Sequence, residues 1–174
     1  MSTRRRIHLA AGIVGMFAVV TAAVPFAAHA DSSANKDLAA ARAATAKYHD
    51  EAVALADGYL RDDFCTEGPD GVMGYHYVNP ALLEAPMDVR TPPILIYQPR
   101  SDGSRKLVAV AYFQVDADQD LSTDDDRPSL FGQGFDGPMD GHGPDMPRHY
   151  DLHAWVWQHN PDGKFAQFNP AGSC

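Results

Sequence analysis

The most regular pattern of hydrophobic and polar positions lies between residues 37 and 62. Mostly apolar side chains recur there every three or four positions, at Leu38, Ala41, Thr45, Tyr48, Ala52, Leu55 and Tyr59. This spacing places them on one face of an α-helix, and the many alanines and the lack of proline favour that conformation. The pattern predicts one long helix over residues 37–62, with this face buried.

After Cys65 the pattern changes to short β-branched and aromatic runs separated by proline and glycine. The runs typical of strands cover residues 75–78, 94–97, 107–115, 152–159 and 164–168. Turn-forming residues at 99–103 and 160–163 predict two antiparallel hairpins, the first in the middle of the sheet. One long helix and about five strands predict an α+β fold, in which an antiparallel sheet packs its apolar face on the helix. Residues 31–174 suffice for a single domain.

Two segments do not fit this alternation. Residues 129–147 hold five glycines and three prolines, which predicts a long loop without secondary structure that is either functional or disordered. Residues 116–126 contain six aspartates, at positions spaced as in some calcium loops. The EF-hand pattern fails, because Leu121 occupies the glycine position and Arg127 the glutamate position. We interpret this segment as a solvated acidic loop, with an irregular calcium site as the alternative.

Residues 1–30 have the features of an export signal. Arg4, Arg5 and Arg6 precede an apolar stretch over residues 9–24, and Ala28-His29-Ala30 matches a cleavage site. We expect the mature chain to begin at Asp31 and the protein to be secreted or otherwise extracytoplasmic. The apolar stretch is too short for stable membrane insertion, and the export route stays open between the general secretory and the twin-arginine pathways.

The net charge of the chain limits the kinds of partner that it is expected to bind. The predicted signal carries three of the 14 Lys and Arg and none of the 23 Asp and Glu, so the remaining chain has a net charge of −12. Such a chain repels phosphate backbones and anionic lipids, which disfavours nucleic acid and membrane surfaces as partners. A metal ion or a small molecule remains.

The only two cysteines are Cys65 and Cys174. In an oxidising compartment such a pair predicts a disulfide bond. Two thiolate ligands for a metal are the alternative, but the spacing does not resemble a CxxC-type site.

Methionine and histidine share a repeated spacing. Three of the four methionines beyond residue 30 stand three residues before a histidine, and two more histidines follow: Met73 before His76, Met139 before His142, Met146 before His149, then His153 and His159. Imidazole is the commonest protein ligand for transition metals, and a thioether adds affinity for copper. The pattern predicts a histidine-rich site for a copper or zinc ion.

Strand geometry limits which histidines can share an ion. His149, Asp151 and His153 would alternate onto one face of a strand, together with Trp155, Trp157 and His159. Positions four apart on a straight strand are about 13 Å apart, too far for one ion unless His149 belongs to the preceding loop. We expect a mononuclear site with His76, His153 and either His142 or His149.

Residues close to these histidines in the sequence are assigned further roles in the predicted metal site. Asp151 would be a ligand or, in preference, the carboxylate that orients an imidazole. Met73, Met139 or Met146 would supply an axial sulfur, which favours copper over zinc. His49 stands beside Asp50 and Glu51, off the helical stripe, and is expected in solvent.

Three alternatives stay open. Histidine and methionine also pack on sheet faces without any metal. Trp155, Trp157, Tyr75 and Tyr77 would line a concave sheet that binds an apolar or sugar-like ligand. An Asp151–His153 pair would serve a cofactor-free enzyme as acid and base, although the chain has no G-x-S-x-G, HExxH or phosphate-loop motif.

Several longer strings of this sequence resemble those of a known group of proteins. The strings MGYHYVNP at residues 73–80, FGQGFDGPMDGH at 131–142 and HYDLHAWVW at 149–157, with NPDG at 160–163 and Asn169-Pro170 before Cys174, are similar to those of a group of secreted bacterial proteins without an assigned activity. The resemblance covers most of the chain beyond residue 30. It implies an extracytoplasmic location and no particular activity, substrate or ligand set.

Overall fold

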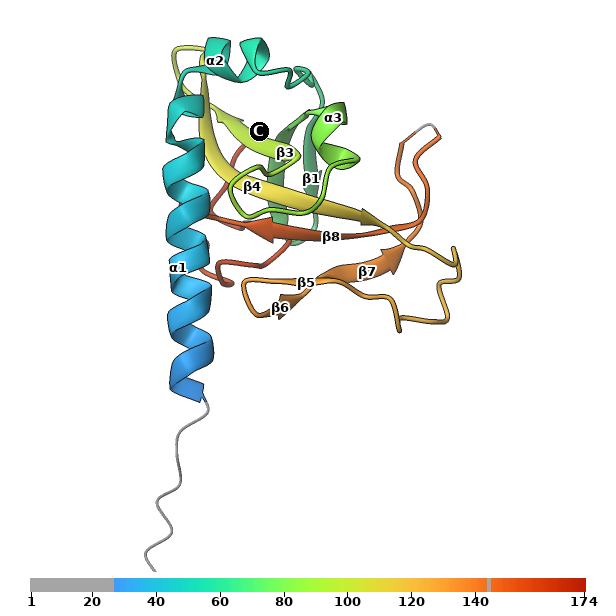
Figure 1. Ribbon diagram of the computed structural model, residues 1–174. Helices are drawn as coiled ribbons and strands as arrows, with labels where there is room; N and C mark the ends of the chain where they lie inside the picture. Colours follow the sequence, from blue (N-terminus) through green and yellow to red (C-terminus); the bar gives the residue numbers. More distant parts are fainter. Residues whose placement is uncertain (1–26, 144) are drawn as a thin grey trace, which may run out of the picture.

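The computed structural model describes residues 27–143 and 145–174. Its elements follow in the order α1 (Ala27–Thr45), η1 (Ala46–His49), α2 (Glu51–Ala56), β1 (Cys65–Gly68), β2 (Gly71–Val78), α3 (Pro80–Leu83), β3 (Ile94–Pro99), β4 (Arg105–Val115), β5 (Ser129–Leu130), β6 (Gln133–Gly134), β7 (Asp136–Met139) and β8 (His149–Ala154). Figure 1 shows α1 running along one side of a curled sheet. The α+β class, with an N-terminal helix and an antiparallel sheet, is confirmed.

The predicted export signal lies outside the described residues, except that residues 27–30 form the first turn of α1. Among the helices that the structure describes, none combines the length and the apolar character needed to cross a bilayer.

The single helix predicted over residues 37–62 is wrong in extent. The α-helix ends at Thr45, a 3₁₀ turn follows, and Asp50 adopts an extended backbone at φ −89° and ψ 106°. The Asp50 side chain accepts a hydrogen bond from Ala52 N at 3.0 Å, which caps a new helix, α2. Gly58, at φ +93°, ends α2 in a Schellman motif, because its N–H bonds Leu55 O and the next N–H bonds Ala54 O.

The sheet has six antiparallel strands in the order β1-β2-β3-β4-β8-β7. The predicted central hairpin is confirmed as β3 and β4. The second predicted hairpin is wrong, because β8 ends at Ala154 and residues 155–168 turn away. Backbone N–H groups of Trp157 and Gln158 both bond Val108 O at 3.1 Å, and Asn160 holds Phe168 O at 2.8 Å. These bonds replace the ladder that a second hairpin would need.

Residues 129–147 are also more ordered than predicted. They contain β5, β6 and β7, and β7 pairs with β8 as a hairpin. Phe131 and Phe135 are buried in the core, so burying two aromatic rings accounts for the order of this Gly-rich segment. Residues 116–126 are confirmed as a loop, exposed apart from the buried Asp116 and the partly buried Gln119.

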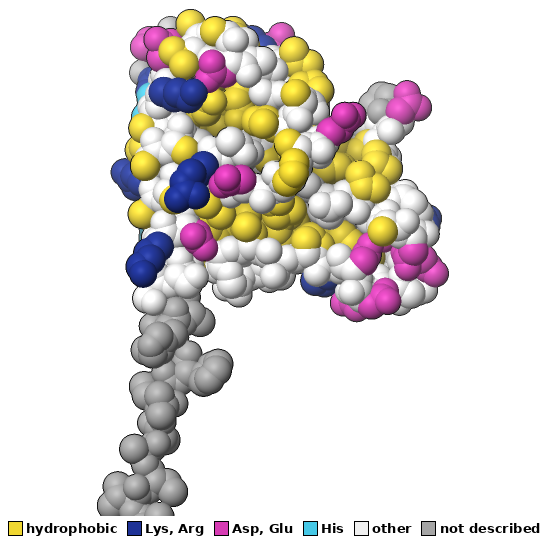
Figure 2. Space-filling view, viewed as in Figure 1, with side chains coloured by type: hydrophobic (Ala, Val, Ile, Leu, Met, Phe, Trp, Pro, Cys, Tyr) yellow, Lys and Arg dark blue, Asp and Glu magenta, His cyan; other side chains and the backbone are white. Residues whose placement is uncertain are grey.

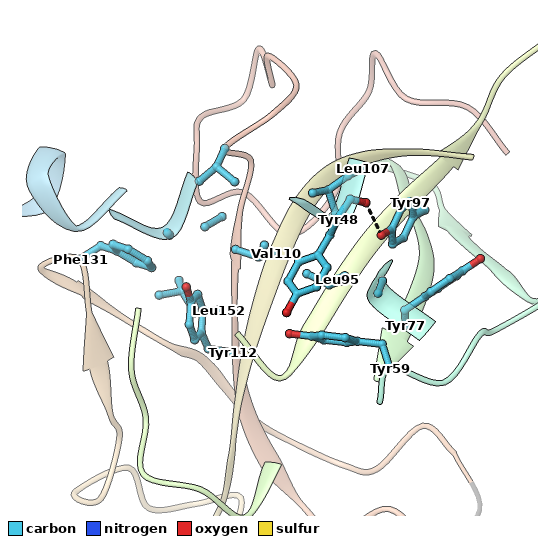
Figure 3. Packing of buried hydrophobic residues seen from close by; sticks show 14 of the residues in the cluster. Tyr48, Tyr59, Tyr77, Leu95, Tyr97, Leu107, Val110, Tyr112, Phe131 and Leu152 are labelled. Atoms are coloured by element: carbon cyan, nitrogen blue, oxygen red, sulfur yellow. Dashed lines mark hydrogen bonds between the residues drawn. The ribbon is translucent and has the colours of Figure 1, made fainter. Parts of the chain in front are cut away.

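The sheet has a different core on each face. Tyrosine dominates the face toward the helices, where Tyr97 donates a hydrogen bond to Tyr48 O at 2.6 Å (Figure 3). The opposite face packs a smaller apolar cluster of Ile94, Ile96, Val108, Ala109, Ala111 and Trp155. Where β3 meets β4 the register shifts, leaving Val108 as an extra residue, and such bulges increase strand twist and bending. The result is a curled half-barrel.

The predicted disulfide is present between Cys65 at the start of β1 and the terminal Cys174, with a Cα–Cα distance of 5.8 Å. It joins the edge of the sheet to the end of the chain.

Candidate metal centre

The fold brings the four predicted histidine ligands together as two pairs. The rings of His76 on β2 and His153 on β8 meet edge to face, with centroids 5.8 Å apart. His142, in the loop after β7, meets His149 at the start of β8 in the same way, at 4.9 Å. Only His76 and His153 come from segments far apart in the sequence, and the four rings do not meet around one point.

Curling of the sheet makes the first pair possible. Two strands separate β2 from β8, so in a flat sheet the two histidines would stand about 14 Å apart. His76 lies opposite Ile96, and His153 lies opposite Ala111, both on the smaller apolar face. Ala109 and Ala111 present only methyl groups there, so the curled sheet has room for two imidazoles. Sequence reasoning missed these alanines, whose only signal was an alternation of small residues in β4.

The register of β8 confirms that His149, Asp151 and His153 share one face. They pair with Val115, Phe113 and Ala111 on β4 and are 1%, 7% and 2% exposed. Because β8 is a strand from His149 onward, His149 does not belong to the preceding loop, and the distance limit between His149 and His153 applies in full. Of the two candidates for the third ligand, only His142 lies in a loop.

The first pair contains polar atoms without partners. Both ring nitrogens of His153 and the Oδ1 atom of Asp151 are buried, and none of the three has a hydrogen-bond partner among the described residues. Asp151 Oδ1 and His153 Nδ1 lie 3.7 Å apart, beyond hydrogen-bond distance. Nearly all buried polar atoms in folded proteins are hydrogen-bonded, and each exception costs about 1–3 kcal/mol. A cation bound to His153 Nε2 would satisfy that nitrogen, and the Nδ1–H on the other side of the ring would then face Asp151 Oδ1.

Burial also sets the protonation states. Burial first, and neighbouring imidazoles second, lower the pKa of His76 to about 3 and that of His153 to about 4. Burial raises the pKa of Asp151 to about 6. At neutral pH both rings are neutral and the carboxylate is ionised, which is the state that a metal ion requires of its ligands.

His142 is central to the electrostatics of the group. The His142 ring interacts electrostatically with His76, His149, Asp151 and His153 and lowers the pKa of each, by less than burial changes it. It is exposed, between Gly141 and Gly143. A Cβ at Gly141 would collide with the Met146 carbonyl, so only glycine lets this loop close over β8.

His149 is held by two contacts that were not foreseen. Its ring stacks on Phe113 at 4.7 Å, and its Nδ1 lies 3.0 Å from Pro147 O. A ring that donates from Nδ1 to a carbonyl keeps the Nε2 lone pair free, as metal-binding histidines usually do.

The three methionines differ in position. Met139 is the direct cross-strand partner of His149, which places their side chains on the same face. Met73 is buried at the register shift between β1 and β2. Met146 is 37% exposed in the loop. Register therefore supports Met139 as the sulfur nearest to a histidine.

The remaining histidines lie apart from this group. His49 is exposed and packs against Trp157 at 4.3 Å. His159 was expected on the face of His153, but the strand stops at Ala154 and His159 is exposed.

The alternative aromatic surface is not assembled as predicted. Tyr75 and Tyr77 pack with the tyrosine-rich core, whereas Trp155 is buried in the core of the opposite face. Arg42 lies over Trp157, 4.4 Å from its ring centroid. The four rings therefore do not form one surface.

Across residues 27–143 and 145–174, no three His, Cys, Asp or Glu side chains already surround a common point. Comparisons of the chain with protein-family models, with curated proteins and with solved structures gave no match. The functional argument therefore rests on the chemistry of the histidine group itself.

Proposed function

We propose that this chain is an extracytoplasmic metal-binding protein whose ion is held by His76, His153 and His142, close to Asp151. The observation that carries the proposal is His153, which is buried beside His76 with both ring nitrogens unpartnered. A structural role alone would leave that desolvation uncompensated.

Binding requires one local change. His76 and His153 already approach from fixed strands, so the third nitrogen must come from His142, by rotation of an exposed side chain in a glycine-flanked loop. Asp151 then lies where a carboxylate can orient the His153 ring or neutralise charge.

The donor set favours copper or zinc. Imidazole nitrogens suit both ions, and Met139, three residues before His142 on the same segment, is the thioether that would favour copper. The role that follows is copper handling. If the chain is instead a small metalloenzyme, the exposed side of His142 leaves a coordination position for water.

Metal analysis of the full chain, purified from an exporting host and dialysed, tests the proposal. We expect about one equivalent of copper or zinc in the parent. His76→Ala and His153→Ala should each abolish retention, because each removes a ligand that no neighbouring side chain replaces. His49→Ala is the matched control, since His49 is exposed and packs on Trp157.

Folding of each variant is checked by circular dichroism before the metal is measured. Folded His76→Ala and His153→Ala proteins that hold as much metal as the parent would show that the ligand set is wrong.

A further inference from the structure

The acidic loop at residues 116–126 contains a buried charge that the histidine centre does not use. Asp116 is fully buried, and within residues 27–143 and 145–174 no group donates a hydrogen bond to either of its carboxylate oxygens. The sequence pattern predicted a solvated loop, and for Asp116 that prediction is wrong. An ionised carboxylate without a partner is among the most costly groups to bury.

Two other carboxylates, those of Asp118 and Asp126, are close enough to Asp116 to affect its charge. Asp126 Oδ2 accepts a hydrogen bond from the adjacent Ala117 N at 2.7 Å, so the far end of the loop folds back onto its start. Asp118 is two residues along the chain. Burial, Asp118 and Asp126 together raise the pKa of Asp116. Three carboxyl groups therefore lie close together, and one of them, Asp116, is shielded from solvent.

Their positions are held from outside the group. Asp126 Oδ1 accepts from Tyr150 OH at 2.7 Å, and Asp118 Oδ2 accepts from Thr123 Oγ1 at 2.7 Å. Each carboxylate oxygen has two lone pairs, so these bonds orient the groups and leave capacity for a cation.

The nearby arginines do not neutralise Asp116. Arg148 pairs with Asp140 at 2.9 Å, and Arg127 pairs with Asp124 at 3.2 Å. Figure 2 shows acidic side chains gathered at the end of the sheet where β4 enters this loop.

We infer that Asp116, Asp118 and Asp126 bind a calcium ion, with solvent water completing the coordination shell. Calcium takes about six to eight oxygen ligands in flexible geometry, which suits carboxylates at a partly exposed site. The site is chemically distinct from the histidine centre, because hard oxygen donors select against copper.

The ion would also position the start of β8. Asp116 N donates to Arg148 O at 3.0 Å, and Gln119 Nε2 donates to the same carbonyl at 2.9 Å. His149 is the next residue, so calcium would fix the strand that carries the histidines. The calcium site itself does not depend on the metal-binding function proposed above.

Thermal unfolding and titration calorimetry of the full chain with calcium chloride, against an EDTA-treated sample, test this inference. At a calcium concentration 100 times Kd, the parent should unfold about 5–10 °C higher. Asp116→Asn and the surface variant Asp118→Asn should each weaken calcium binding at least about tenfold, because each removes one ligand charge. Asp125→Asn is the matched control, since Asp125 is exposed in the same loop, and it should bind as the parent does.

Other outcomes would overturn the inference. A parent whose unfolding temperature does not respond to calcium, while Asp116→Asn raises that temperature in EDTA, would mean that the carboxylates share a proton instead. Unchanged calcium affinity in both Asp116→Asn and Asp118→Asn would exclude these ligands. His153→Ala should keep the calcium response, which separates this site from the histidine centre.

Discussion

At the scale of single residues, the buried polar atoms distinguish this protein from an ordinary packed domain. His153 and Asp116 each place unpartnered polar atoms out of contact with water, at opposite ends of the paired stretch of β4 and β8. Such atoms reduce stability unless something binds them, so both point to ligands.

The metal-free protein should lose stability as pH falls from about 6.5 toward 4. Burial lowers the pKa of His153 from 6.5 to about 4, so in this range only the unfolded chain gains a proton. The contribution is complete above pH 6.5 and is lost at lower pH, on the order of 3 kcal/mol for this ring. Urea unfolding in EDTA at several pH values measures it.

Two variants separate the groups behind this slope. His153→Gln should make the loss shallower, because glutamine does not titrate, and the lowered pKa of His76 should account for the loss that remains. The raised pKa of Asp151 acts in the opposite sense, adding stability as pH falls through about 6. Asp151→Asn should therefore steepen the loss and be more stable than the parent at pH 7. Equal slopes in the parent and His153→Gln would contradict the assignment.

Residue identity alone was enough to nominate His76, His142, His149 and His153. It did not show that Asp116 is buried among aspartates that face solvent, because burial of one member of a charged run depends on where the following residues pass. Nor did it show that Phe113 stacks on His149, because that contact joins the neighbouring strands β4 and β8.

At the scale of elements, strands with long apolar runs could be predicted from the sequence, whereas the places where a helix or strand is interrupted could not. The β3–β4 hairpin follows from two β-branched runs and a Pro-to-Gly turn. The break at Asp50 carries a local signal, an aspartate able to cap, but the same residue is tolerated inside helices. Tertiary packing decides whether the helix continues through Asp50 or is capped there. Leu55, which the helical periodicity placed on the buried face, is 42% exposed.

Replacement of Asp50 should test that break. Asp50→Ala removes the hydrogen bond from Ala52 N and should lower the free energy of unfolding by about 1 kcal/mol. Asp50→Asn keeps a capping oxygen and should stay near the parent value. Chemical denaturation compares the three proteins, and an Asp50→Asn loss as large as that of Asp50→Ala would argue against capping.

At the scale of the whole molecule, the sheet is closed on itself enough for β2 and β8 to place rings in contact across two intervening strands. The disulfide between Cys65 and Cys174 ties the β1 edge of that sheet to the chain terminus. Both features hold distant segments of the chain together.

Removing the disulfide should cost much of the stability. The bond spans 109 residues, and the chain-entropy argument gives about 4–5 kcal/mol for a loop of this size. The Cys65→Ser/Cys174→Ser double variant should therefore unfold at markedly lower denaturant concentration. Thiol labelling of the unfolded, unreduced parent should find no free thiol, and two labelled cysteines would refute the bond in solution.

By itself the sequence determined the α+β class, the central hairpin and the pairing of the two cysteines, and it supplied the residue types of the proposed metal site, because these depend on local periodicity and on composition. Only the tertiary structure decided which histidines meet, that Ala109 and Ala111 leave room for them, and that Asp116 is buried. These depend on the curl of the sheet, which arises from bulges and from packing on both faces and has no local signature in the chain.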